Sequence, residues 1–393
     1  QAELWALHRG YAELFAGIAP LTPRTLRRSG KLRIGYVSAD FRMHVMFPFY
    51  FGLLACHDRG QFTVTCYSLS REQDAFTEEV RRRVERFVDL SSLSYAEAAR
   101  VIREDGIDIL IDLGGHAGGS GLPILAYRPA PLQISGIGYL DTTGLPAVDA
   151  LITDDVLDVP ETRAAFLSER RLVLPCAFCY AGRSDLPASE GTPSAKGRPL
   201  VFGVFNHYRK ITDEMLAAWR VILERTPGSR LLLKSQELVS DSLVDAAYER
   251  LKGIGFDMTR VAFEPATLDY MERYLTVDIA LDTYPYPGGG TTFDALYMGV
   301  PVVTRYSARR NTRFGLSILR CVGLEQLAAD SLEGYIERAV GLARDEELLS
   351  ALHKSLRSML RASVAGDPLR YTRLFERKVL ALWEEKQQGM EKE

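Results

Sequence analysis

The sequence predicts an α/β protein with two domains, each built on a parallel sheet covered by helices, and a helical C-terminal tail. Two observations support this prediction. Short, almost wholly apolar segments alternate with helical segments twice along the 393 residues, and such segments are typical of parallel strands covered by helices on both faces. A stretch rich in Gly, Ser, Pro and charge, residues 181–199, separates the two series and is typical of an interdomain linker.

The composition is that of an ordinary globular protein and disfavours several classes of function. The chain is 47% hydrophobic and 25% charged, and its net charge of −3 gives no basic field for nucleic acid. No apolar run approaches the roughly 20 residues of a membrane-spanning helix, and the N-terminus lacks the order of a signal peptide. Five scattered cysteines fit a reducing compartment. We therefore expect a cytoplasmic protein with neither nucleic acid nor membrane as a partner; the oligomeric state has no signal.

Residues 1–28 predict a helix followed by a Pro-containing linker, and residues 29–180 predict the first α/β domain. Helices are expected between its strands, for example over 73–86 and 94–105. The expected strands are bounded by turns or helical patterns, and they are 32–40, 62–69, 108–115, 132–140 and 150–156.

Residues 200–365 predict the second α/β domain, and residues 366–393 predict a last helix. The apolar stripe of one helix comes from Met215, Trp219 and Ile222, at spacings of four and three. Two such domains facing each other would place their strand ends around a cleft, where open α/β sheets bind ligands. The expected strands are 200–206, 230–235, 260–265, 278–284 and 301–306.

The stretch LDTYPYPGGGTTFDALYMGVP, residues 281–301, predicts an anion site. A strand runs into three glycines, two threonines (Thr291 and Thr292) and a helical pattern with Asp294 in its first turn. Helix N-termini carry unpaired amides and partial positive charge, and glycines let an anion approach them. Asp294 is placed to accept hydrogen bonds from ribose hydroxyls. An ordinary glycine-rich turn capped by Thr291 or Thr292 is the alternative.

Polar residues after other expected strands complete the set of candidates. Lys210, in the segment FNHYRK, can reach the same sheet edge and stabilise charge on a leaving diphosphate; a surface lysine is the alternative. His44 and His116 follow strands of the first domain, where imidazole suits proton transfer or polar substrate contact. A structural, hydrogen-bonded histidine is the alternative for each. Asp282 lies at the end of a buried strand, and we expect it to be a structural residue.

Several signatures are absent. There is no GxxxxGK[ST] phosphate loop, no GxGxxG after the first strand, no GxSxG elbow and no DxD-like pair in a metal-holding loop. Their absence predicts a nucleotide diphosphate held with no obligatory metal and no other cofactor. Cys176 and Cys179 form a CxxC, but no second pair or nearby His completes a zinc set. Two partly buried thiols are therefore favoured over a zinc or redox site.

Five stretches together resemble the catalytic region of the O-GlcNAc transferase and SPINDLY group, glycosyltransferase family 41. They occur in order over residues 25–390, and they are LRIGYVSADFRMH, DGIDILIDLGGHAGG, RPAPLQISGIGYLDTTGLPAVDALITD, FNHYRKI and VDIALDTYPYPGGGTTFDALYMGVPVVT. The resemblance implies a GT-B fold, with two Rossmann-like domains facing a cleft and a last helix crossing back to the first. It also implies a TPR superhelix before residue 1, of which the helix at 1–28 would be the end or a replacement.

The resemblance implies an activity as well: inverting, metal-independent transfer from a UDP-sugar, with UDP-GlcNAc expected, to Ser or Thr of a protein or peptide acceptor. The C-terminal domain would bind the donor, and the N-terminal domain would help form the acceptor site. Asparagine glucosylation with UDP-Glc and O-fucosylation with GDP-fucose are alternatives. A module that binds a nucleotide sugar or peptide without turnover, and a GT-B-like sugar-nucleotide epimerase, are alternatives of other classes.

Carried over by position, the resemblance assigns roles to single residues. Lys210 would contact the diphosphate and stabilise the departing UDP, and Asp294 would bind the ribose. His44 would lie at the active site and His116 near the cleft, so these two and Lys210 are the candidate catalytic residues. The other donor-binding candidates are Asn206, His207, Tyr270, Arg273, Gly289, Gly290, Thr291 and Thr292.

The chain departs from the family pattern at four places. Gly289 and Gly290 stand where most members carry His or Thr, which removes side-chain donors to the sugar phosphate. Tyr270 stands where many members have His, and it could still stack on uracil. Bulky apolar residues follow His44. The segment 304–314 is unusually basic and is either a contact for phosphate or an acidic acceptor, or a solvated loop.

Overall fold

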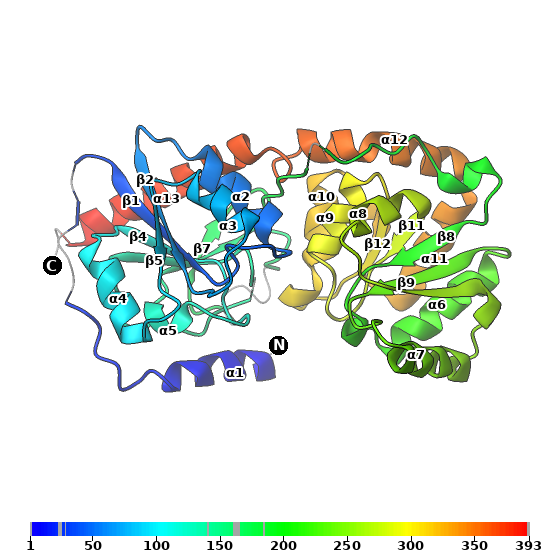
Figure 1. The fold of residues 1–393 in the computed structure, drawn as a ribbon, viewed down its shortest axis with the longest axis horizontal. Helices are drawn as coiled ribbons and strands as arrows, with labels where there is room; N and C mark the ends of the chain where they lie inside the picture. The colour runs from blue at the N-terminus through cyan, green and yellow to red at the C-terminus, as the bar shows by residue number, and fades with distance from the viewer. Residues whose placement is uncertain are drawn as a thin grey trace. The chain divides into compact units, whose positions relative to one another are not determined.

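The computed structural model describes residues 2–22, 26–27, 29–139, 141–159, 166–183 and 185–390. It divides into two compact units, residues 1–181 with 364–393 and residues 182–363 (Figure 1). Parts of four expected segments lie outside the described residues: the N-terminal helix and linker (1, 23–25 and 28), one strand end (140), the interdomain linker (184) and the tail (391–393).

The first unit is built on a seven-stranded parallel sheet in the order β3-β2-β1-β4-β5-β6-β7. All five strands expected here are present, and two further strands, β3 and β7, lie at the sheet's edges. The strand order reverses between β1 and β4, and ligands of open α/β sheets bind at such switch points. The strands are β1 (Leu32–Ser38), β2 (Phe62–Ser68), β3 (Arg86–Asp89), β4 (Ile109–Asp112), β5 (Leu132–Ser135), β6 (Ala150–Thr153) and β7 (Arg170–Val173).

The predicted helix over 73–86 is wrong at its C-terminal end. Helix α3 (Ala75–Arg81) begins after the N-cap Asp74, whose carboxylate accepts from the Phe76 and Thr77 amides, and the chain then forms β3. Exposed and half-buried side chains alternate irregularly along this four-residue edge strand, so no apolar run marks it in the sequence. The predicted helix over 94–105 is confirmed as α4 (Tyr95–Glu104).

The second unit is built on a six-stranded parallel sheet in the order β10-β9-β8-β11-β12-β13. All five strands expected here are present, and the unexpected β13 adds two residues at one edge. The strand order reverses between β8 and β11, so the switch point of this unit lies where they meet. The strands are β8 (Val201–Val204), β9 (Arg230–Ser235), β10 (Val261–Pro265), β11 (Ile279–Leu281), β12 (Val302–Arg305) and β13 (Ala328–Ala329).

Helices cover the sheets of both units (Figure 1). In the first unit they are α1 (Ala2–Glu13), α2 (Phe47–Cys56), α3, α4, α5 (Leu122–Leu125) and α13 (Pro368–Met390). In the second they are α6 (Asp213–Arg225), α7 (Asp241–Ile254), α8 (Tyr270–Arg273), α9 (Gly290–Tyr297), α10 (Phe314–Cys321), α11 (Leu332–Arg344) and α12 (Glu346–Ala362). Among the described residues, no helix combines the length and the apolar character needed to cross a bilayer.

A chain of hydrogen bonds links the outer helices of the second unit to the end of β11. The predicted stripe of Met215, Trp219 and Ile222 on α6 is fully buried. The Trp219 indole N–H donates to the Tyr335 hydroxyl of α11 at 3.0 Å, and this hydroxyl donates to the Asp282 carbonyl at 3.0 Å. Helix packing therefore fixes the point at which the glycine-rich turn begins.

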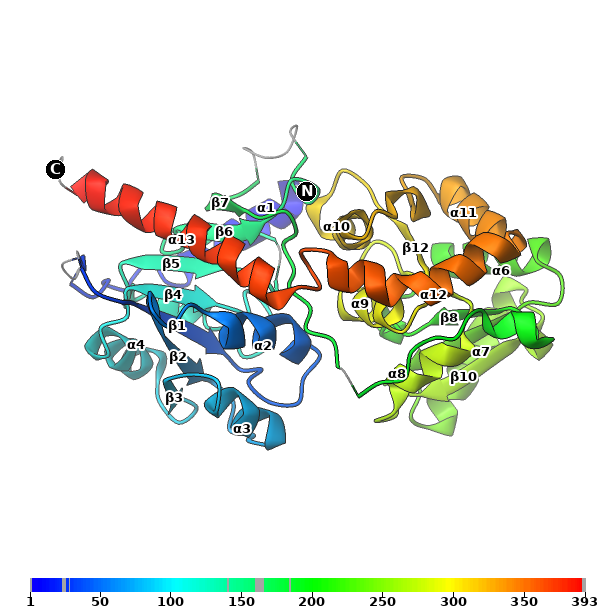
Figure 2. The same ribbon diagram turned by 90° about the horizontal axis from the view of Figure 1, so that it is seen from above.

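The last helix, α13, lies beside α2 and β7 of the first unit (Figure 2). Its buried Glu376 Oε1 lies 3.0 Å from His57 Nδ1 and accepts from the Asp58 amide at 2.7 Å. Because a carboxylate oxygen accepts, Nδ1 of His57 carries the proton and Nε2 accepts from the Tyr36 hydroxyl at 2.7 Å. Burial lowers the pKa of His57. Burial alone would raise the pKa of Glu376, but the hydrogen bonds that it accepts hold it below its usual value.

We expect Glu376→Ala to lower the free energy of unfolding by about 2–4 kcal/mol, because it leaves the His57 and Asp58 donors buried without an acceptor. Urea denaturation at neutral pH measures this loss. Glu385→Ala is the matched control, since it removes an exposed carboxylate of the same helix that pairs with Arg170; the expected change is below about 1 kcal/mol. Equal losses in the two variants would contradict the role given to Glu376.

Candidate active site

The turn between β11 and α9 closes around the buried carboxylate of Asp282. Its Oδ1 accepts from the amides of Thr283 at 2.9 Å and Gly288 at 2.7 Å, and from Asn206 Nδ2 at 3.0 Å. Its Oδ2 accepts from the Thr304 hydroxyl on β12 at 2.7 Å. Burial raises the pKa of Asp282, and these four donors oppose the shift. The contacts are those of the structural residue that the sequence predicts.

Asn206, which follows β8, joins this turn to the neighbouring strand. Besides its bond to Asp282, its Nδ2 donates to the Thr283 hydroxyl at 2.8 Å, and its Oδ1 accepts from the Thr291 hydroxyl at 2.5 Å. The orientation of the amide is thereby fixed. The structure thus brings Asn206 and Thr291, two predicted donor-binding residues, into direct contact at the switch point.

Gly288, Gly289 and Thr292 differ in what they contribute to the turn, and Gly290 is the first residue of α9. The Thr292 hydroxyl donates to the Gly288 carbonyl at 2.8 Å and is buried, so it is used within the turn. A Cβ added at Gly288 would overlap Thr291 Oγ1 and lie 2.8 Å from Asn206 Oδ1, whereas one at Gly289 would meet nothing within 4 Å. The turn therefore requires a glycine at 288, and it leaves open space beside 289.

Lys210 ends the short 3-10 helix η2 (Tyr208–Lys210) after β8 and faces the same turn. Its Nζ lies 4.4 Å from the centre of the Tyr286 ring. Burial lowers the pKa of Lys210, while the carboxylates of Asp282 and Glu237 oppose that shift. Within the described residues Lys210 forms no ion pair, so its ammonium can meet an anion. Tyr286 was not predicted as a site residue, although it lies two residues before Gly288 in the segment 281–301.

Asp294 is the fifth residue of α9, so its predicted place in the first turn is wrong by one residue, because the helix already begins at Gly290. It is buried and accepts from the Tyr270 hydroxyl at 2.9 Å. Burial and the Asp294 charge both raise the pKa of Tyr270. Arg273, on the same short helix as Tyr270, pairs instead with Glu264 on β10 at 2.6 Å. Tyr270 therefore contacts Asp294, the predicted ribose-binding carboxylate. Arg273 instead joins α8 to the sheet through its ion pair with Glu264.

His207 is held by the loop that follows β9. Its Nδ1 lies 2.7 Å from Glu237 Oε1, and the Gln236 side chain also contacts the ring. Burial alone would raise the pKa of Glu237, but hydrogen bonds from its neighbours, including the Tyr208 amide, lower it to about 2. His207 is therefore fixed on the β9 side of Lys210, whereas Asn206 meets the turn after β11.

His44 follows β1 in the first unit. Its Nδ1 accepts from the Met46 amide at 3.3 Å and lies 3.5 Å from Asp40 Oδ1. Burial lowers the pKa of His44, and the Asp40 carboxylate opposes the shift. In the neutral ring the proton is then on Nε2, which makes His44 a hydrogen-bond donor in this arrangement. The bulky residues Met43 and Val45 on either side of it are exposed.

His116 follows β4 and is covered by α1. Its Nε2 donates to the Thr143 carbonyl at 2.8 Å. Its ring centre lies 4.9 Å from that of His8, 4.6 Å from that of Tyr11 and 5.3 Å from that of Tyr139. These are the contacts of a structural histidine, the alternative that the sequence left open; a catalytic role for His116 stays a prediction.

The basic segment 304–314 makes mainly internal contacts. Arg305 pairs with Glu214 at 3.0 Å and lies over the Tyr284 ring. Arg313 Nη1 donates to the Ser307 carbonyl at 2.9 Å, and Arg310 is buried. Arg309 is the exposed arginine of this segment. These contacts fit neither a purely solvated loop nor a free cationic patch.

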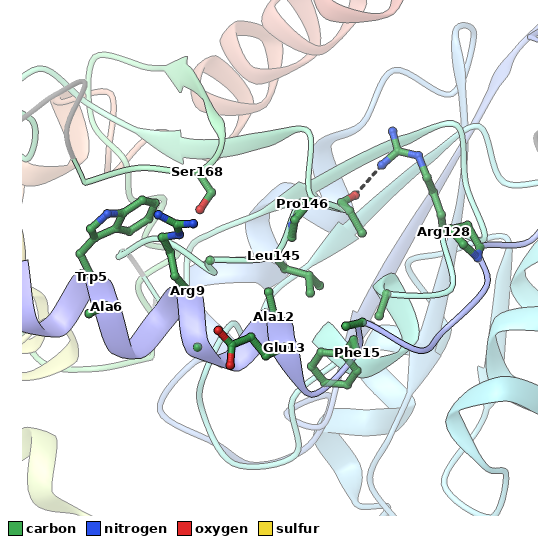
Figure 3. A pocket seen from close by; sticks show the side chains of 16 residues that line it. Trp5, Ala6, Arg9, Ala12, Glu13, Phe15, Arg128, Leu145, Pro146 and Ser168 are labelled. Atoms are coloured by element: carbon green, nitrogen blue, oxygen red, sulfur yellow. Dashed lines mark hydrogen bonds between the residues drawn. The ribbon is translucent and has the colours of Figure 1, made fainter.

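Two cavities differ in their relation to these residues. A groove of about 1000 Å³ lies between α1 and the segment 126–147, with Trp5, Arg9, Phe15 and Leu145 among its lining (Figure 3). None of the predicted site residues lines it. A cavity of about 10 Å³ lies under the turn and is lined by Asn206, Asp282, Thr291 and Thr292 among others, which is about the space of one water molecule.

The described residues contain no group of three or more His, Cys, Asp or Glu side chains that could hold a metal ion. Cys176 and Cys179 are buried free thiols. Burial raises the pKa of Cys179 well above its ordinary value, and a thiol is neither nucleophile nor metal ligand until it ionises. The contacts thus agree with the interpretation of the CxxC as two buried thiols.

Two parallel sheets, each with a reversal of strand order at its switch point, define a doubly wound α/β protein. The model of the family "Glycosyl transferase family 41" matches residues 20–185 and 193–374. The chain therefore belongs to glycosyltransferase family 41, and the resemblance seen in the sequence is confirmed.

Curated relatives agree with this assignment. Two are described as probable UDP-N-acetylglucosamine–peptide N-acetylglucosaminyltransferase SPINDLY: that of Petunia hybrida is 36% identical over 361 residues (90% of this chain, 39% of the relative), and that of Arabidopsis thaliana is 37% identical over 345 residues (86% and 37%). The SEC protein of Arabidopsis thaliana, described as the same kind of probable transferase, is 32% identical over 384 residues (93% and 39%). The chain thus spans about two fifths of the length of these relatives.

Solved structures support the fold class. A mutant of the Thermobaculum terrenum O-GlcNAc transferase matches with a TM-score of 0.91 and 33% identity, covering 98% of this chain and 74% of that one. Sucrose-phosphate synthase of Thermosynechococcus elongatus matches with a TM-score of 0.59 and 14% identity, covering 89% of this chain and 100% of that one, which bears on the fold alone. The predicted α/β fold of GT-B class is confirmed.

We expect Gly288→Ala to lower the free energy of unfolding by about 1–3 kcal/mol, because the added methyl group overlaps hydroxyl and amide groups that are already bonded. Gly289→Ala adds the same methyl group one residue later, into open space, and we expect a change below about 1 kcal/mol. Thermal and urea unfolding of the two variants measure the difference. A loss in Gly289→Ala as large as that in Gly288→Ala would contradict this account of the turn.

Proposed function

We propose that the chain is the catalytic region of an inverting, metal-independent protein glycosyltransferase. It transfers GlcNAc from UDP-GlcNAc to Ser or Thr of a protein or peptide acceptor. The observation that carries the proposal is the meeting of Lys210, free of any ion pair in the described residues, with the turn before α9 at one switch point. Membership of family 41 and the relatives' descriptions as peptide N-acetylglucosaminyltransferases support it.

The diphosphate of the donor is assigned to the start of α9. Backbone amides at a helix N-terminus favour an anion, and the bare backbone beside Gly289 gives it access. Lys210 adds a full positive charge from the neighbouring strand end. Asp294 is assigned to the ribose hydroxyls, which it would bind together with Tyr270, the residue that already donates to it.

The chemistry then depends mainly on position and charge. The acceptor hydroxyl attacks the anomeric carbon from the face opposite UDP, and its proton passes to water or to a phosphate oxygen of the donor. The bond between the anomeric carbon and the β-phosphate oxygen breaks, UDP leaves, and the configuration inverts. Negative charge grows on the departing diphosphate, and Lys210 stabilises it there. His44 is assigned to a polar contact at the acceptor side, donating through Nε2, because its Nδ1 already accepts from the Met46 amide.

The five free cysteines support a reducing, cytoplasmic setting.

A second candidate is transfer of a sugar other than GlcNAc, namely glucose from UDP-Glc to asparagine or fucose from GDP-fucose to a hydroxyl. Two observations favour keeping it: the open space beside Gly289, where most members present a donor side chain, and the bond of Tyr270 to Asp294. Intact-mass analysis of acceptor proteins incubated with each of the three donors decides between them. The leading proposal predicts an increment with UDP-GlcNAc, undiminished by EDTA; an increment with another donor alone would replace it.

We expect Lys210→Ala to reduce transfer about 10²- to 10³-fold while leaving the fold intact, because the leaving diphosphate loses its stabilising charge. The rate of product formation, with circular dichroism as the test of folding, measures this. Lys252→Ala is the matched control, since it removes an exposed lysine of the same unit that lies near a Tyr248 ring, and it should keep wild-type turnover. Near-normal turnover by a folded Lys210→Ala variant would reject the assigned role.

A further inference from the structure

The ammonium of Lys210 rests on an aromatic face. Its Nζ lies 4.4 Å from the centre of the Tyr286 ring, well inside the range over which a cation is attracted to an aromatic ring. Tyr286 is itself positioned at two points: its carbonyl accepts from the Thr283 hydroxyl at 2.8 Å, and its ring meets that of Phe314 at 6.2 Å, edge to face. The ring is therefore part of the turn that Asp282 organises.

The other groups facing Lys210 are already engaged. The Asp282 carboxylate, which acts on Lys210 electrostatically, accepts from four donors. The Glu237 carboxylate, on the β9 side, accepts from the Tyr208 amide and the Ser235 hydroxyl and pairs with His207. Both fields favour a charged lysine, yet neither carboxylate lies within ion-pair distance of it. Tyr286 is thus the aromatic side chain that lies against the charge, while both carboxylates are bonded to other groups.

We propose that Tyr286 is a positioning residue, whose ring holds the Lys210 ammonium charged and directed at the start of α9 before the donor binds. The inference rests on the proposed function, in which that ammonium meets the diphosphate. A lysine side chain has many rotamers and loses hydration when it is buried. An aromatic face compensates in part for that loss. Unlike a carboxylate, it bears no charge that would compete with phosphate for the lysine or repel the donor.

The test compares two substitutions at this position by steady-state kinetics with UDP-GlcNAc, or with whichever donor the panel identifies. Tyr286→Leu keeps an apolar side chain but removes the aromatic face, and we expect kcat to fall about tenfold while KM for the donor changes less than twofold. Tyr286→Phe keeps the face and should restore kcat to within twofold of the wild type.

The pH profile separates this role from a merely structural one. The attraction between ring and cation favours charged Lys210, so its removal lowers the pKa of the lysine. The basic limb of the kcat/KM profile, which reports the free enzyme, should therefore move to lower pH by about one unit in Tyr286→Leu and stay in place in Tyr286→Phe. Loss of kcat with an unmoved basic limb, or equal losses in the two variants, would overturn the inference.

Two further variants keep the outcome unambiguous. Tyr248→Leu makes the same change at an exposed ring of the same unit that lies 6.0 Å from a lysine ammonium, and it should leave kcat and its pH profile unchanged. Lys210→Ala is assayed alongside. If Lys210→Ala remains active, the proposed function fails; if it is inactive while Tyr286→Leu behaves as wild type, the inference on Tyr286 alone fails. Unfolding curves verify that each variant is folded under assay conditions.

Discussion

In each unit, a buried carboxylate stands at the end of the strand beside the switch point: Asp112 in the first unit and Asp282 in the second. The loop that follows this strand and carries candidate site residues must satisfy that carboxylate. The following loop and the next strand both donate to it, and in each unit one backbone amide and one hydroxyl do so at 2.7 Å: Gly115 and Ser135 for Asp112, Gly288 and Thr304 for Asp282. Burial raises the pKa of both carboxylates. An unpaired buried carboxylate is very costly, so the loops must close where these donors reach it. That closure sets the start of α9 and the loop that carries His116.

The charges around the second turn follow from the same closure. The carboxylate oxygens of Asp282 accept hydrogen bonds from the turn and from Asn206. Asp282 therefore favours the charged form of Lys210 without forming an ion pair with it. The same holds for Glu237, because its carboxylate oxygens already contact His207 and accept from the Tyr208 amide. The result is a cation near two carboxylates that are both occupied. An anion brought to this edge meets Lys210 and backbone amides, which is the combination a leaving diphosphate requires.

Much of the fold and part of the site could be predicted from the sequence. Buried strands are apolar runs, so ten were found, while β3, β7 and β13 were missed because edge strands of two to four residues carry no such run. The glycine-rich turn and Asp282 could be predicted because helix N-termini and strand ends have local signatures. Tyr286 could not, since an aromatic residue in a Pro-rich turn shows its role only through contact with Lys210. The packing of α1 against His116 brings together residues more than 100 positions apart, such as His8 and His116. No local sequence pattern predicts such a contact.

The central claim is that the diphosphate of a nucleotide sugar binds at the start of α9 beside Lys210. A crystal structure of the chain with UDP tests it most directly. The account predicts diphosphate oxygens within hydrogen-bond distance of Lys210 Nζ and of the first backbone amides of α9, with the ribose hydroxyls against Asp294. UDP bound elsewhere in the chain, with Lys210 still resting on Tyr286 and α9 free of phosphate, would contradict it.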